Sequence, residues 1–167
     1  MNQHTSDLEG RIRYTKDIYL RAGKNCPKIS LSGLIAPMDS EKTLPLKDGQ
    51  VFDAGGITLE AIDAPGHTQG MMMILFREPK YILFGDACGV GVLLVEDCSS
   101  SVERYLKMLK GIKKYEIYYN RILRNHGTYE SSKELLDNVI DVCYEILGGT
   151  DDHILAEVTI ASSACVY

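Results

Sequence analysis

The sequence lacks the features that mark membrane-spanning, disulfide-bonded and nucleic-acid-binding proteins. No apolar run approaches the roughly 20 residues that a bilayer-spanning helix needs, and the polar residues 1–7 lack the apolar core of a signal peptide. Five cysteines are widely spread without a Cys-x-x-Cys pair, which favours reduced thiols over a disulfide framework. A net charge of −5, with lysine and arginine only in short runs, argues against nucleic acid or an anionic membrane as the partner. We therefore expect a soluble, cytoplasmic protein.

The composition suits one folded domain. Of the 167 residues, 45% are hydrophobic and 25% charged, and a chain of this size buries roughly 70% of its unfolded surface. Period-two and apolar runs predict strands over 50–53, 57–62, 71–76, 81–84 and 117–123. Helical spacing predicts helices over 5–22, from Ser100 and from Ser131, the last two opened by capping boxes with Glu103 and Glu134. The fold class predicted is α/β, a mixed β-sheet with flanking helices.

Three side chains that can bind metal follow the ends of predicted strands. His67 lies in a turn with Pro65 and Gly66, Asp86 follows Gly85, and His126 precedes Gly127. Imidazole and carboxylate are ligands that zinc, iron and manganese accept. A lone histidine is more often a hydrogen-bonded loop residue, but the context that the three share favours a metal site. We expect the tips of the three side chains to lie within roughly 3–6 Å of one another.

These segments also carry a family resemblance. Residues 64–70 (APGHTQG), 83–87 (LFGDA) and 125–127 (NHG) resemble, in that order, the later metal-binding motifs of metallo-β-lactamase-fold hydrolases. The resemblance implies an αββα domain and a site for two metals, zinc or else iron or manganese. It implies that His67 binds the first metal, that Asp86 bridges both and is the catalytic candidate, and that His126 binds the second. The implied activity is hydrolysis of a small-molecule thioester, lactone, amide or phosphoester.

One motif of that family is absent. Its first motif, His-x-His-x-Asp-His, has no counterpart here, and neither His4 nor His153 has a partner at that spacing. The chain therefore resembles the C-terminal half of the family's domain over 45–149, with a helix and irregular connector over 1–44 and a tail or edge strand over 150–167, all within a single domain.

Two functional interpretations follow from this partial resemblance. The chain is a metal-dependent hydrolase that is catalytically incomplete by itself, or it is a non-catalytic half-domain that acts through homodimerisation or a partner chain. A sheet that lacks the family's other half leaves an apolar face and an open edge, so we expect a homodimer. Cys88, two residues from Asp86, has no histidine positioned to activate it, and we expect a packed, inert thiol.

Overall fold

A computed structural model describes residues 44–94, 99–126 and 129–154, most of which belong to one compact unit, Leu46–His153. The helix and connector predicted over 1–44, apart from Leu44, and most of the tail or edge strand predicted over 150–167 lie outside the described residues. None of the helices in the described ranges is long and apolar enough to cross a membrane.

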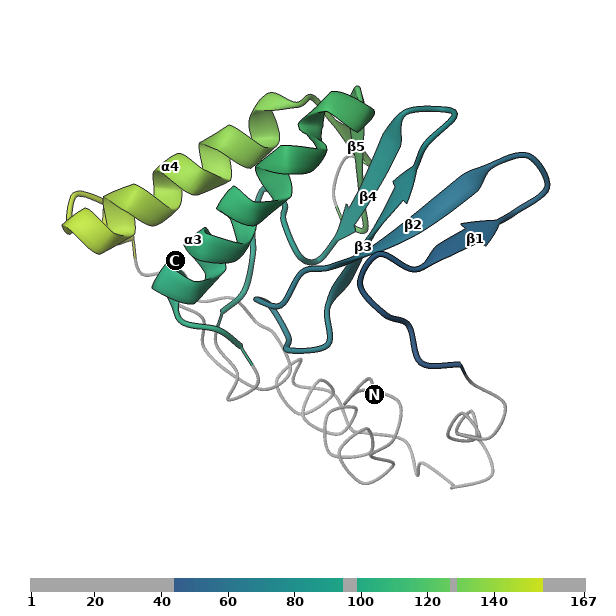
Figure 1. The fold of residues 1–167 in the computed structure, drawn as a ribbon. Helices are drawn as coiled ribbons and strands as arrows, with labels where there is room; N and C mark the ends of the chain where they lie inside the picture. Colours follow the sequence, from purple (N-terminus) through teal and green to yellow (C-terminus); the bar gives the residue numbers. More distant parts are fainter. Residues whose placement is uncertain (1–43, 95–98, 127–128, 155–167) are drawn as a thin grey trace, which may run out of the picture. The chain divides into compact units, whose positions relative to one another are not determined.

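The centre of this unit is a six-stranded sheet with the strand order β1-β2-β3-β4-β5-β6 (Figure 1). Strands β1 to β4 pair as antiparallel neighbours, β5 runs parallel to β4, and β6 is antiparallel to β5. The strands are β1 (Val51–Asp53), β2 (Thr58–Asp63), β3 (Met72–Phe76), β4 (Tyr81–Gly85), β5 (Arg121–Arg124) and β6 (Glu130–Ser131). The predicted α/β class with a mixed sheet is confirmed.

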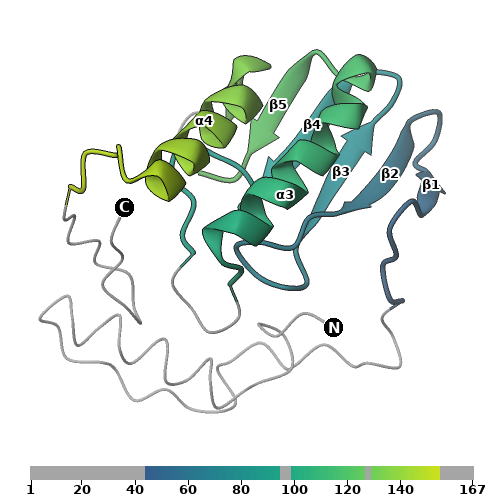
Figure 2. The same ribbon diagram turned by 60° about the vertical axis from the view of Figure 1, so that its left-hand side comes forward.

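The change from antiparallel to parallel pairing requires a crossover between β4 and β5. Helix α3 (Val102–Ile112) and the 3-10 helix η3 (Lys113–Tyr118) form that crossover, and α4 (Glu134–Gly148) follows β6. Both α-helices cover the same face of the sheet and lie side by side (Figure 2). Each has one buried apolar stripe at helical spacing, which explains why these segments fold as helices against a sheet. The buried residues are Tyr105, Leu106, Leu109 and Ile112 on α3, and Leu135, Leu136, Ile140 and Cys143 on α4.

The two faces of the sheet differ in burial. Side chains that point toward the helices are buried completely or nearly so: Ile62, Met73, Leu75, Ile82, Phe84 and Ile122. The opposite face is apolar as well, but its large side chains are only half-buried: Leu59, Ile74, Phe76, Tyr81, Leu83 and Leu123. Cross-strand register places Ile74 opposite Leu83, and Leu83 opposite Leu123, so these side chains form one continuous row. Strand β3 is thus central in the sheet but fully covered on one side only.

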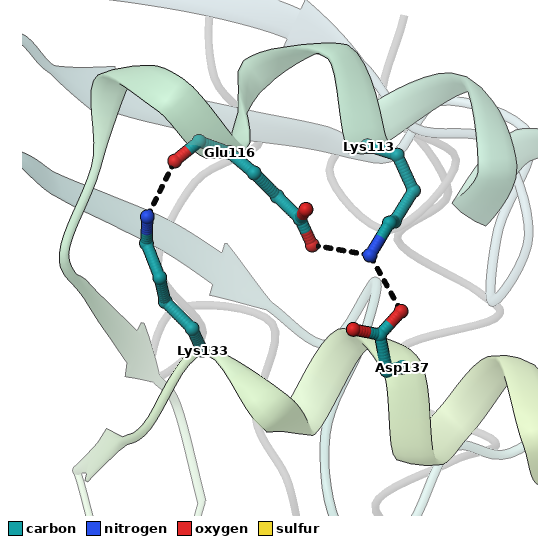
Figure 3. Close-up of polar contacts among 4 residues, drawn as sticks. All are labelled: Lys113, Glu116, Lys133 and Asp137. Atoms are coloured by element: carbon teal, nitrogen blue, oxygen red, sulfur yellow. Dashed lines mark hydrogen bonds and ion pairs between the residues drawn. The ribbon is translucent and has the colours of Figure 1, made fainter.

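Polar contacts join the crossover to the start of α4 (Figure 3). The Lys113 ammonium lies 2.9 Å from a Glu116 carboxylate oxygen and 2.5 Å from a carboxylate oxygen of Asp137 on α4. Lys133 donates a hydrogen bond of 2.6 Å to the backbone oxygen of Glu116. These contacts fix where α4 begins relative to η3, although their exposure to solvent limits the free energy that each contributes.

The structure corrects two local predictions. The run 117–123 is not one strand, because residues up to Tyr118 continue the 3-10 helix and β5 begins only at Arg121. The capping boxes are also wrong: the N-cap residues are Ser101 and Lys133, without side-chain capping bonds, and Ser131 belongs to β6. At its C-terminus α4 ends at Gly149, which adopts a left-handed conformation with φ of 65° and closes the last turn.

Candidate metal centre

The ends of β4 and β5 bring two of the predicted ligands together. The two strands are parallel neighbours, and their register pairs Gly85 with Arg124, so the residues that follow them emerge at the same edge of the sheet. Asp86 comes directly after β4, and His126 follows β5 by two residues. His126 Nε2 lies 3.1 Å from Asp86 Oδ1. These side chains are 40 positions apart in the sequence, and the parallel pairing of β4 with β5 brings them together in space.

Gly85 makes this arrangement possible. Its φ of 58° lies in the left-handed region, which residues with a Cβ rarely adopt. A Cβ at this position would also lie 3.2 Å from the Met71 side chain and 3.4 Å from the amide nitrogen of Asn125. The glycine therefore turns the chain sharply at the end of β4 and places Asp86 beside the loop that carries His126.

A small open cavity adjoins the pair. It has a volume of about 280 Å³ and is lined by Gly85, Asp86, Gly89, Val90, Gly91, Arg124 and His126. This volume lies just below the usual range for small-molecule sites, roughly 300–1,000 Å³. The His126 side chain is 85% exposed, whereas that of Asp86 is 33% exposed. Solvent or a further protein segment can therefore reach His126 directly.

His67 is held in the loop between β2 and β3. Its Nδ1 lies 2.8 Å from the backbone oxygen of Leu93. Because a carbonyl oxygen only accepts hydrogen bonds, Nδ1 carries a proton, and in the neutral ring the lone pair is then on Nε2. Ser99 Oγ also donates a bond of 2.8 Å to the backbone oxygen of His67. An imidazole whose second nitrogen donates to a carbonyl is the usual form of a metal-binding histidine.

Comparisons with known proteins find partial similarity in sequence and in fold. The chain is 30% identical over 106 residues to the lactamase-like protein aptB of Emericella nidulans (63% of this chain, 30% of that protein). It is 33% identical over 95 residues to the atrochrysone carboxyl ACP thioesterase AgnL7 of Paecilomyces divaricatus (56% and 26%). It is 28% identical over 100 residues to BaeB of Bacillus velezensis, a probable polyketide biosynthesis zinc-dependent hydrolase (58% and 43%). A solved metallo-β-lactamase family protein from Thermus thermophilus superposes with a TM-score of 0.57 at 17% identity (84% and 48%).

The chain belongs to the metallo-β-lactamase superfamily. No family model matches it. The matches are partial: the chain spans 26% to 43% of these three relatives and about half of the solved structure. Its superfamily relatives include named thioesterases and a zinc-dependent hydrolase.

Because BaeB is named as a probable zinc-dependent hydrolase, the donor atoms of this chain can be compared with those that a catalytic zinc ion needs. Catalytic zinc sites have three protein ligands and one open position. Within the described ranges, no group of three His, Cys, Asp or Glu side chains is close enough to hold a metal ion. The structure unites Asp86 with His126, but it does not bring His67 into a three-residue group with them. The donors described here therefore do not fit a catalytic zinc ion by themselves.

Two further residues near the site contribute to its structure. Cys88 is fully buried, as expected for a packed thiol, and burial raises the pKa of the thiol to about 12. Tyr105 is buried on α3, and its hydroxyl donates a bond of 2.8 Å to the backbone oxygen of Ala87, next to Asp86. Tyr105 belongs to the apolar stripe of α3 and is not singled out by the sequence alone. The hydroxyl of a tyrosine within such a stripe was the signal for this second role, because a buried hydroxyl needs a partner.

Proposed function

We propose that these residues form the Asp86–His126 side of the active site of a metal-dependent hydrolase, whose remaining metal ligands lie outside the described residues. The observation that supports the proposal is the 3.1 Å contact between Asp86 and His126 at the ends of adjacent parallel strands. Asp86 supplies a carboxylate and His126 an imidazole at the mouth of one open cavity. His67, already oriented by Leu93, supplies a third donor from the neighbouring loop.

Catalysis in this proposal needs metal-binding donors beyond those of the described residues. The superfamily motif His-x-His-x-Asp-His is absent from the sequence, and two side chains do not make a catalytic zinc site. The roles that belong to the chain itself are therefore positional. Gly85 sets the direction of Asp86, the Leu93 carbonyl sets the tautomer of His67, and the exposed ring of His126 faces the side from which another segment can approach.

Among the substrate classes that the motifs imply, we favour thioesters. Two arguments support this choice: AgnL7 is named as an acyl carrier protein thioesterase, and BaeB is named as a zinc-dependent hydrolase of polyketide biosynthesis. The cavity of about 280 Å³ accommodates the reacting group of an acyl thioester rather than a whole large substrate.

The test of this proposal begins by following the reading frame upstream of residue 1 for the His-x-His-x-Asp-His motif. A longer polypeptide that carries both parts is then assayed with a short acyl thioester, and thiol release is followed at several zinc concentrations. We expect zinc-dependent hydrolysis that falls at least about 100-fold in His126→Ala and in Asp86→Ala, as is found for the loss of an essential group. Exposed Lys107→Ala on α3 is the control and keeps full activity. Unaltered turnover in both site variants would overturn the proposal.

We also propose a second function, a half-domain that acts through self-association. The half-buried apolar row on the open face of the sheet, centred on Ile74, Leu83 and Leu123, favours it. A second copy of the chain is the proposed cover, across a two-fold interface of more than about 1,000 Å². Sedimentation across a dilution series distinguishes the outcomes. A dimer that Leu83→Glu dissociates supports this function, whereas a folded monomer at low micromolar concentration excludes it.

A further inference from the structure

One side chain on α3 contacts both of the turns that carry the proposed ligands. The ring of Tyr105, only 2% exposed, packs against Gly66, the residue before His67. The approach is so close that a Cβ on Gly66 would lie 2.5 Å from Tyr105 Cδ2 and 3.0 Å from Cε2. Real Cβ atoms do not come this near to a ring carbon, so the packing requires glycine in the His67 turn.

The other end of the same side chain reaches the Asp86 turn. Tyr105 Oη donates a hydrogen bond of 2.8 Å to the backbone oxygen of Ala87, in a fully buried environment. Burial raises the pKa of the Tyr105 hydroxyl above its ordinary value, so the hydroxyl keeps the proton that it donates. Ala87 follows Asp86 directly, and its own amide is bonded to Phe84 at the end of β4. The hydroxyl therefore holds the chain immediately after the carboxylate.

The segment that leads into α3 is fixed to the His67 turn as well. The Ser100 amide donates a bond of 2.8 Å to the backbone oxygen of Gly66. Ser99 Oγ donates a bond of 2.8 Å to the backbone oxygen of His67. Together with the ring contact, these bonds attach the His67 turn to the N-terminus of α3 at three points. A shift of the helix therefore moves the His67 turn with it.

We infer that Tyr105 is a positioning residue that couples the His67 turn to the Asp86 turn and keeps the two turns in register. The coupling has a physical basis in the ring, which is a rigid spacer between Gly66 on one side and the Ala87 carbonyl on the other. Displacement of the ring by the first turn breaks the hydrogen bond to the second. The coupling itself does not depend on the proposed function; only its purpose, keeping the two ligand-bearing turns in register, rests on that function.

The chain contains its own reporters for the coupling. Cys88 is fully buried directly after Ala87, and its thiol also contacts the Tyr105 hydroxyl. Loss of that contact alone disfavours the reactive thiolate and slows alkylation, so a faster Cys88 rate reports local opening of the Asp86 turn. Cys143 is buried on α4 and reports global unfolding. Alkylation of each cysteine by iodoacetamide at a fixed pH is read by peptide mass spectrometry in the full 167-residue chain. A merely structural role would raise both rates in parallel, whereas local opening raises the Cys88 rate alone.

The first comparison removes one hydroxyl group. In Tyr105→Phe we expect the ratio of the Cys88 rate to the Cys143 rate to rise about tenfold, because a buried carbonyl loses its donor. Tyr119→Phe is the matched control: Tyr119 is also fully buried, but its hydroxyl has no hydrogen-bond partner among the described residues. We expect Tyr119→Phe to leave the ratio of the Cys88 rate to the Cys143 rate within about twofold of its value in the parent chain. Equal ratios in the two variants, or a parallel rise of both rates, would overturn the inference.

The second comparison tests coupling across the two turns. Gly66→Ala changes only the His67 turn, yet we expect the Cys88 ratio to rise about tenfold, as in Tyr105→Phe. In the Tyr105→Phe background the same change raises the ratio less than about twofold further, because the link is already broken. If the two substitutions raise the ratio independently, so that their effects multiply in the double variant, the coupling is refuted. No substrate is present in either measurement, so an inactive enzyme with the expected ratios refutes the proposed hydrolase and leaves this inference standing.

Discussion

Replacing Gly66 by alanine is the most informative single change in the fold. Gly66 does not have a positive φ, so its backbone conformation is open to alanine and the effect is purely steric. The new Cβ would stand 2.5 Å from Tyr105 Cδ2, against an ordinary carbon–carbon contact of roughly 3.5–4.0 Å. The ring cannot move freely, because it is buried and its hydroxyl is bonded to Ala87.

The magnitude follows from two opposing effects. Overpacking of a well-packed site costs about 1–3 kcal/mol, and the lower entropy of an unfolded alanine returns about 0.4–1 kcal/mol. We expect Gly66→Ala to lower the free energy of unfolding by about 1–2 kcal/mol. Gly111→Ala is the control, since Gly111 is exposed on α3 and a Cβ there would meet nothing within 4 Å. The loss of a helical glycine stabilises by up to about 1 kcal/mol.

Urea unfolding followed by circular dichroism measures both variants against the parent chain. The two substitutions are chemically identical, so the difference between them isolates the contact with Tyr105. We expect Gly66→Ala to unfold at lower urea and Gly111→Ala at equal or higher urea. If Gly66→Ala is as stable as Gly111→Ala, the close approach of Tyr105 to the His67 turn is wrong.

Three further outcomes are expected for the core and the surface. Tyr119→Phe is neutral or stabilises by up to about 1 kcal/mol at pH 7, because it removes a buried hydroxyl that has no partner among the described residues. Burial raises the pKa of Tyr119, so the stability that depends on its neutral hydroxyl is intact below about pH 10 and is lost as the pH rises further. Above pH 10 the phenylalanine variant should therefore lose less stability than the parent chain, by up to about 1.4 kcal/mol per pH unit. Equal slopes of unfolding free energy against pH in the two proteins would contradict this. Leu136→Ala, at a fully buried position, lowers the free energy of unfolding by about 2–5 kcal/mol. Lys113→Met lowers it by less than about 1 kcal/mol, because the ion pairs of Lys113 are exposed. Similar losses for the two variants in urea unfolding would refute this order.

Periodicity was enough to predict the strands and helices that carry strong hydrophobic patterns. The apolar runs at 71–76 and 81–84 correspond to β3 and β4 within one residue, because a covered strand has few polar residues to obscure it. The run at 117–123 misled for the opposite reason. Tyrosine and isoleucine have high strand propensity, but Ile117 and Tyr118 remain exposed on the 3-10 helix that completes the crossover.

The candidate site was predictable in its residues but not in its geometry. Glycine beside Asp86 and His126 marked strand ends, and the parallel pairing of β4 with β5 then brought those side chains together. Sequence alone does not state which strands pair, and although a buried tyrosine hydroxyl needs a partner, the sequence does not identify Ala87 as the partner of Tyr105. That contact depends on the angle at which α3 crosses the sheet, which is a property of the packed structure. The ligand roles of His67, Asp86 and His126 stay predictions.

Zinc titration of the 167-residue chain by calorimetry, combined with a thioester hydrolysis assay, decides whether these residues alone hold a catalytic metal site. We expect weak zinc binding, with a dissociation constant above about 1 μM, because Asp86 and His126 are only two close donors among the described residues. We also expect no zinc-stimulated hydrolysis by this chain alone. Tight binding of two zinc ions, together with hydrolysis that His67→Ala abolishes, would refute this expectation, since the 167 residues would then hold a complete catalytic site.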